Sequence, residues 1–87
     1  MILSKAHRKT TIQYRIGLDQ LEYDKLQRYW GQADIAFYRS IASKIIEPES
    51  TVAGHGQLCF EIARDDESLC QLDADILFTY VRGVISR

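Results

Sequence analysis

Two short segments alternate apolar and polar residues with a period of two, and this pattern constrains the fold more than any other feature. They span residues 10–18 and 57–63. Their apolar side chains are Ile12, Tyr14, Ile16 and Leu18 in the first segment, and Leu58, Phe60 and Ile62 in the second. Alternation over such a length is typical of a strand with one buried face and one solvated face. The sequence therefore predicts two half-buried strands.

The first strand leads directly into a helix. Asp19 is a typical helix N-cap residue, and Glu22, three positions later, completes a capping box. The apolar residues that follow recur at steps of three and four, at Tyr23, Leu26, Trp30, Ala33 and Phe37 and then at Ile41 and Ile45. A stripe that keeps one phase in this way predicts a single long helix from about Gln20 to Ile46.

Gly31 is the weak point of that helix. Either the helix continues through it, at a cost of up to about 1 kcal/mol relative to alanine, or it kinks or ends there. Pro48 disfavours helical geometry at Glu47 and so marks the far end. Residues 47–56 have the composition of a loop.

A second helix follows the second strand. Asp65 and Asp66 stand where an N-cap and an acidic first turn belong. Beyond them, an apolar stripe at helical spacing consists of Leu69, Leu72, Ile76, Tyr80 and Val84. Leu77 and Val81 widen this stripe. Residues 76–85 also have strand propensity, so a strand there is the alternative.

The expected fold class is α+β, in the order strand, long helix, strand, helix, within one domain of residues 1–87. Two strands alone form a marginal sheet. A third strand therefore comes from residues 2–6, from the C-terminal segment or from another copy of the chain. In the absence of pairing, residues 1–9 would form a flexible basic arm.

The long helix carries more apolar surface than a small sheet covers. Outside its main stripe lie Ile35, Tyr38, Ala42 and Ile46, and Tyr29 is beside Trp30. Because large uncovered apolar surfaces mark interfaces, this surplus predicts a homodimer. The partner-binding candidates are Tyr29, Trp30, Ile35 and Tyr38, since aromatic residues supply much of the energy at interfaces.

One basic cluster occurs in the chain, at the N-terminus. Lys5, Arg8 and Lys9 lie among the first eighteen residues, which contain no acid. Such residues bind phosphate oxygens without sequence preference, which gives a nucleic-acid-associated regulator as the first alternative function. The formal net charge of −1 provides no general attraction toward nucleic acid.

The sequence contains no recognisable catalytic constellation. The residue that most resembles a catalytic one is His55, which lies between Gly54 and Gly56, because histidine titrates near neutral pH. A small enzyme or ligand-binding domain centred on His55 is the second alternative function. The acidic run Asp65–Glu67, with Asp73 and Asp75, lacks the spacing of an EF-hand. Cys59 and Cys70 lack the paired spacing of a zinc site. No metal, cofactor or catalytic residue is expected.

These observations together predict a small, non-enzymatic protein-binding or assembly module, such as an adaptor, inhibitor or regulatory subunit. No segment approaches the roughly 20 apolar residues that span a bilayer. The N-terminus places its apolar residues before its basic ones, the reverse of a secretory signal, which predicts a cytoplasmic protein without membrane partners.

Overall fold

The computed structural model describes residues 1–8, 11–46 and 58–87, with Arg8 by its backbone alone. The chain folds in the order β1 (Ile2–Arg8), β2 (Thr11–Leu18), α1 (Gln20–Gln27), α2 (Gln32–Ile41), β3 (Lys44–Ile46), β4 (Leu58–Arg64) and α3 (Glu67–Ile85). The predicted α+β class is confirmed.

The strands form one antiparallel sheet in the order β1-β2-β4-β3. Both strands predicted from the alternation are present, and Tyr14 lies opposite Ile62 while Ile16 lies opposite Phe60. The third strand comes from the N-terminal residues, because β1 pairs with β2 over its whole length. Residues 2–8 are therefore strand and not a flexible arm, and the sheet does not need a second copy to complete it.

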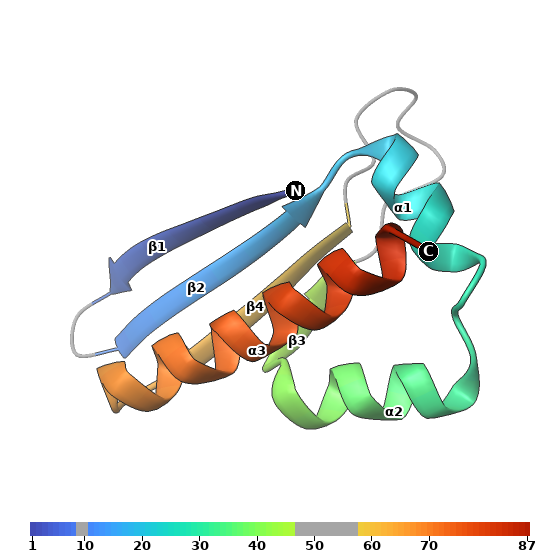
Figure 1. Cartoon of the computed structure of the whole chain (residues 1–87). Helices are drawn as coiled ribbons and strands as arrows, with labels where there is room; N and C mark the ends of the chain where they lie inside the picture. The colour runs from blue at the N-terminus through green and yellow to red at the C-terminus, as the bar shows by residue number, and fades with distance from the viewer. Residues whose placement is uncertain (9–10, 47–57) are drawn as a thin grey trace.

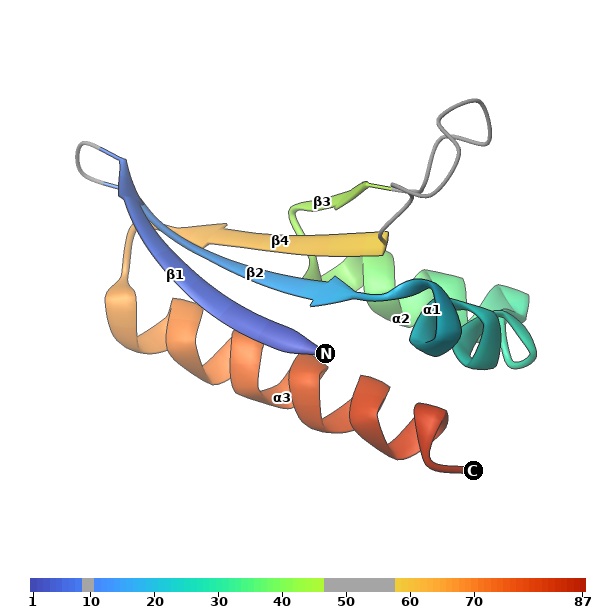
Figure 2. The same ribbon diagram turned by 90° about the horizontal axis from the view of Figure 1, so that it is seen from above.

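All three helices lie on one side of the sheet (Figures 1 and 2). Between the two layers lies the core, and the predicted inward faces of β2 and β4 supply its sheet side. The fully buried large side chains are Ile16, Leu18, Leu26, Tyr38, Leu58, Phe60, Ile62, Leu77 and Val81. The opposite face of the sheet is more polar, with an ion pair between Arg15 and Glu61 at 2.9 Å.

The predicted long helix is wrong: the chain forms two helices that meet near Gly31. The Asp19–Glu22 capping box starts α1 as predicted. At the far end the amides of Tyr29 and Trp30 bond back three residues, which ends α1 in a tight turn. Gly31 then serves as the extended N-cap of α2, and its N–H donates to the Asp34 carboxylate.

This break changes which residues of α2 face the core. The predicted stripe ran through Ala33, Phe37 and Ile41, whereas Tyr38 and Ala42 are the buried residues and Ala33 is exposed. The helix also ends at Ile41 and not at Ile46, because the chain turns into β3. Tyr38 and Ala42, which were assigned to a partner surface, are therefore packed inside a single chain.

Helix α3 (Glu67–Ile85) confirms the predicted helix over residues 76–85 and excludes the alternative strand. Its N-cap is Asp66, whose carboxylate accepts hydrogen bonds from the N–H groups of Ser68 and Leu69. Its sheet-facing side is formed by Cys70, Ala74, Leu77, Val81 and Val84. Within the described part of the chain no helix combines the length and the apolarity needed to span a bilayer.

The junction between α2 and β3 is held by one arginine. The Arg64 guanidinium donates to the Ser43 hydroxyl at 2.8 Å and to the Ile41 carbonyl at 2.7 Å, and it lies 3.4 Å from the Asp73 carboxylate. Ser43 in turn accepts a hydrogen bond from the N–H of Ala63. These bonds connect α2, β3, β4 and α3, which fixes the position of the short edge strand.

Candidate functional site

Two of the four predicted partner-binding residues belong to the core or its margin. Tyr38 is completely buried, so assigning it to an interface was wrong. Its ring stacks on that of Trp30 with centroids 5.1 Å apart and contacts the ring of Phe60 at 5.2 Å. Burial raises the pKa of the Tyr38 hydroxyl. That hydroxyl has no hydrogen-bond partner among the described residues.

The other two predicted residues are accessible but separate. Tyr29 is exposed, and the guanidinium of Arg87 lies 5.3 Å from the centre of its ring. Ile35 is half-buried and lines a pocket together with Trp30. The structure therefore does not bring the four predicted residues together as one surface.

Of the predicted nucleic-acid-binding residues, Lys5 is fully described and already has an acidic partner. Its ammonium group forms an ion pair with Glu67, and this bond raises the pKa of Lys5 and lowers the pKa of Glu67. Lys9 and the side chain of Arg8 lie outside the described residues. The described part of the N-terminal cluster thus offers no isolated cation for a phosphate.

The catalytic and metal alternatives receive no further support. His55 and its flanking glycines lie outside the described residues. Within residues 1–8, 11–46 and 58–87, no group of three or more His, Cys, Asp or Glu side chains converges as a metal site would require. Burial raises the pKa of the Cys59 thiol, which disfavours the reactive thiolate.

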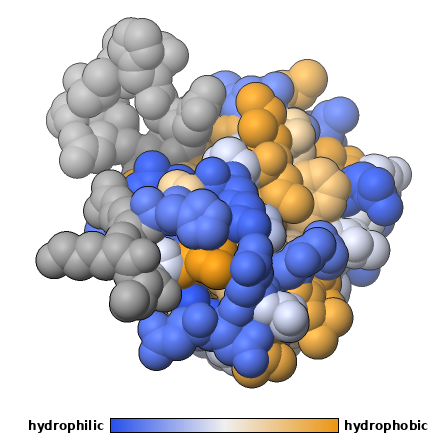
Figure 3. All heavy atoms as spheres, turned by 90° about the vertical axis from the view of Figure 1, so that its left-hand side faces the viewer, coloured by the Kyte–Doolittle hydropathy of each residue, from blue (hydrophilic) through white to orange (hydrophobic). Residues whose placement is uncertain are grey.

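The most unusual surface lies on the solvent side of α3. Residues spaced by three and four along this side are Leu69, Leu72, Ile76, Thr79 and Gly83, which we call the outer face of α3. Leu69 and Leu72 are each 54% exposed and Ile76 is 44% exposed. Figure 3, which looks at the left-hand side of Figure 1, shows hydrophobic side chains reaching the surface among hydrophilic ones.

The apolar surface continues from α3 onto α2. A shallow depression beside Ile76 is lined by Phe37, Tyr80, Thr79 and Asp75. Tyr80 is fixed there because its hydroxyl donates to Asp34 at 2.9 Å, a bond that also raises the pKa of Tyr80. The outer face of α3 is thus the exposed part of a larger apolar surface.

Two opposite charges flank this face without partners of their own. Of the charged residues in α3, Glu67 pairs with Lys5 and Asp73 pairs with Arg64. Asp75 and Arg82 have no ion-pair partner among the described residues, although Arg82 lies 5.8 Å from the centre of the Phe78 ring. They lie two helical turns apart on the same flank.

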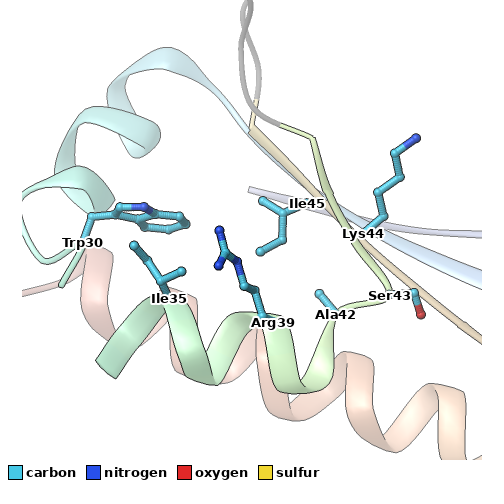
Figure 4. A pocket seen from close by; sticks show the side chains of 7 residues that line it. All are labelled: Trp30, Ile35, Arg39, Ala42, Ser43, Lys44 and Ile45. Atoms are coloured by element: carbon cyan, nitrogen blue, oxygen red, sulfur yellow. The ribbon is translucent and has the colours of Figure 1, made fainter. Parts of the chain in front are cut away.

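A second candidate site lies between α2 and β3. This pocket of about 520 Å³, which we call the Arg39 pocket, is lined by Trp30, Ile35, Arg39, Ala42, Ser43, Lys44 and Ile45. Figure 4 shows the Arg39 guanidinium directed into the space between the Trp30 ring and Ile45, while Lys44 points away. The Arg39 guanidinium forms no ion pair and no hydrogen bond with any other described residue.

Sequence reasoning identified Trp30 and Ile35 but missed the residues that make these sites. For Arg39 the available signal was its position in the last turn of an amphipathic helix, next to Ile35 on the preceding turn. For α3 the signal was a helix with apolar residues on both sides, which indicates a second covered face.

Comparison with protein-family models, with curated protein sequences and with solved structures finds no match to this chain.

Proposed function

We propose that this protein is a small, non-enzymatic protein-binding module that assembles as a homodimer through the outer face of α3. The observation that carries the proposal is the exposure of Leu69, Leu72 and Ile76 on one side of a helix whose other side already fills the core. A contiguous apolar surface of this kind on a soluble domain usually marks an interface. The sheet has four strands within one chain and does not need a second copy to form, so we assign the dimer to the helix.

A second copy of the chain fits this face in an antiparallel arrangement. The residues of the outer face follow the a and d positions of a heptad repeat, the pattern with which helices pack side by side. When Leu72 lies against Gly83 of the second copy, Ile76 lies against Thr79 of that copy. Each large side chain then meets a small one, and the contact repeats itself across a two-fold axis.

The charges agree with the same register. Antiparallel packing places Asp75 of one copy near Arg82 of the other, and the two-fold axis generates the pair twice. These two residues have no ion-pair partner in the described part of their own chain. Parallel packing would instead place Asp75 and Arg82 of the two copies on opposite flanks of the contact, where this pair cannot form.

Gly83 supports a close approach of the two helices. It lies in the interior of α3, where glycine costs about 1 kcal/mol relative to alanine. A methyl group added at its Cα would meet nothing within 4 Å among the described residues of the same chain. The fold of one chain therefore gives no reason for glycine here, whereas an opposing leucine does.

A cytoplasmic location fits this proposal. Cys59 and Cys70 are both free thiols. Unpaired cysteines are usual in reducing compartments. In that setting, an adaptor or regulatory subunit would present its remaining surfaces, including the Arg39 pocket, in two copies.

Sedimentation equilibrium over a concentration series tests the dimer. We expect the parent to dimerise and the variant Leu72→Gln/Ile76→Gln to sediment as a monomer with an unchanged circular dichroism spectrum. Leu21→Gln is the matched control, since Leu21 is 65% exposed but lies on α1. A parent that stays monomeric at about 100 μM would contradict the proposal, since that concentration already detects weak association.

Charge reversal tests the register in the same instrument. Asp75→Arg and Arg82→Asp should each weaken the dimer, and the double variant should restore it, because the swapped charges attract again. Failure of the double variant to recover would exclude the antiparallel pairing described here.

A further inference from the structure

The Arg39 pocket combines apolar side chains with the Arg39 guanidinium, which has no ion-pair partner among the described residues. Trp30, Ile35 and Ile45 form the walls, and each is half-buried. The Arg39 guanidinium projects into the space that they enclose (Figure 4). A guanidinium presents a rigid fork of donors that matches the two oxygens of a carboxylate. Its environment therefore favours an anion that is attached to an apolar body.

The pocket is held in shape before any ligand enters. The Trp30 ring stacks on Tyr38, which is itself completely buried. On the opposite side, the bonds from Arg64 to Ser43 and to the Ile41 carbonyl fix the start of β3. Binding would then require little ordering of the protein, which favours affinity for a small ligand.

The size of the pocket agrees with a small organic ligand. Sites for such ligands usually enclose about 300–1,000 Å³ and have mostly apolar walls with a few polar groups that fix orientation. The Arg39 pocket, at about 520 Å³, lies within this size range, although its lining is more polar than usual because Arg39, Ser43 and Lys44 contribute to it. It shares no residue with the outer face of α3, so the two sites can be tested separately.

We propose that the Arg39 pocket binds a carboxylate carried on an aromatic or branched apolar body. The guanidinium of Arg39 would hold the carboxylate, and the Trp30 ring would contact the apolar part. A free aromatic acid and the C-terminal residue of a peptide both have this chemistry. This binding site does not depend on the proposed dimer.

Trp30 is the only tryptophan in the chain, so its fluorescence reports on the pocket directly. The first probe pair is 3-phenylpropanoate and the neutral 3-phenylpropanamide, which differ only in the charged group. The second pair is a short peptide ending in phenylalanine with a free carboxylate and the same peptide with an amidated end. The tighter of the two carboxylate probes identifies the source of the ligand.

Two variants measure the contribution of the Arg39 guanidinium to binding. Arg39→Gln removes the charge from the pocket and keeps a good helix former, whereas Arg28→Gln removes a nearby exposed arginine that does not line it. We expect saturable binding of at least one carboxylate probe, weakened about tenfold or more by Arg39→Gln or by the amide, because a charge-assisted hydrogen bond is lost. Arg28→Gln should bind like the parent.

Two results would overturn the proposal. One is the absence of a saturable response to either carboxylate probe, confirmed by unchanged amide chemical shifts of the pocket residues. The other is equal binding by the parent and by a folded Arg39→Gln variant. Neither result depends on whether the chain dimerises, since the outer face of α3 is unaltered in both proteins.

Discussion

The two helical regions of this chain use their apolar residues in opposite ways. In the α1–α2 region the apolar residues outside the predicted stripe, Tyr38 and Ala42, turn inward and complete the core. In α3 the first three residues of the predicted stripe, Leu69, Leu72 and Ile76, turn outward to solvent. The region whose sequence predicted a partner surface buries these apolar residues within one chain. The helix whose sequence predicted an ordinary core element instead exposes part of its apolar stripe.

Side-chain size explains the difference. The start of α3 places Cys70 and Ala74 against the sheet, and the Cys70 sulfur lies 3.4 Å from the Ile12 carbonyl oxygen and 3.3 Å from that of Ile62. This close approach is available only to small residues. Leucines cannot occupy the same positions without moving the helix away from the sheet, so they lie on the other side.

A matched pair of leucines should give the largest contrast. Leu77→Ala removes a completely buried side chain and should lower the free energy of unfolding by about 2–5 kcal/mol. Leu72→Ala removes a half-exposed one and should change the stability of the monomer by less than about 0.5 kcal/mol. Urea denaturation at low protein concentration measures both. Equal losses would mean that the two sides of α3 are not distinct.

Removal of the buried Tyr38 hydroxyl should change the free energy of unfolding less than Leu77→Ala does, and in the opposite direction. Tyr38→Phe removes a polar group that has no partner among the described residues, so the variant should be as stable as the parent or more stable by about 1 kcal/mol. A clear loss of stability would indicate that the hydroxyl is hydrogen-bonded after all, for instance to ordered water.

The same variant has a pH signature. Burial raises the pKa of Tyr38, and the bond to Asp34 raises that of Tyr80, above the ordinary value of 10.0. The folded state then holds protons that the unfolded state has lost, so stability is full below pH 10 and falls as the pH rises further. Denaturation of the parent and of Tyr38→Phe between pH 9 and 11 should show a shallower fall for the variant.

Alanine substitutions at two glycines should change the free energy of unfolding in opposite directions, each by about 1 kcal/mol or less. Gly31→Ala should destabilise the chain, because alanine is a poor N-cap and a new methyl would lie 3.3 Å from the Asp34 carboxylate. Gly83→Ala should stabilise the isolated monomer, because α3 gains helix propensity in open space. Thermal denaturation at low protein concentration measures both signs.

Gly83→Ala should also weaken dimerisation, since the added methyl would meet Leu72 of the second copy. A variant with higher monomer stability and weaker association separates the two roles of this residue. Association as strong as that of the parent would place Gly83 outside the interface.

Local patterns predicted much of the fold. The alternation around Tyr14 and Phe60 identified both central strands and their buried faces, and Asp19 with Glu22 marked the start of α1. These features depend on neighbouring residues only. The N-terminal strand remained one of three alternatives because its sequence, which contains Lys5 and His7, lacks a clean alternation.

The break near Gly31 and the orientation of α3 were beyond such patterns. A stripe that keeps its phase through Gly31 does not show that the helix ends before this residue and that Trp30 stacks on Tyr38. The spacing of Leu69 and Leu72 does not show which side of α3 meets the sheet. Both outcomes depend on contacts between distant parts of the chain, as does the Arg39 pocket.

Disulfide cross-linking between copies tests the interface on α3 most directly. Equimolar Ile76→Cys and Thr79→Cys proteins, mixed under mild oxidation, should form the mixed 76–79 disulfide in preference to either homodimer, because antiparallel packing brings these positions together. The native thiols give the background, since Cys70 is buried and burial raises the pKa of Cys59. Mass spectrometry should find the mixed species dominant, whereas cross-linking no greater than that of the parent would contradict a dimer through the outer face of α3.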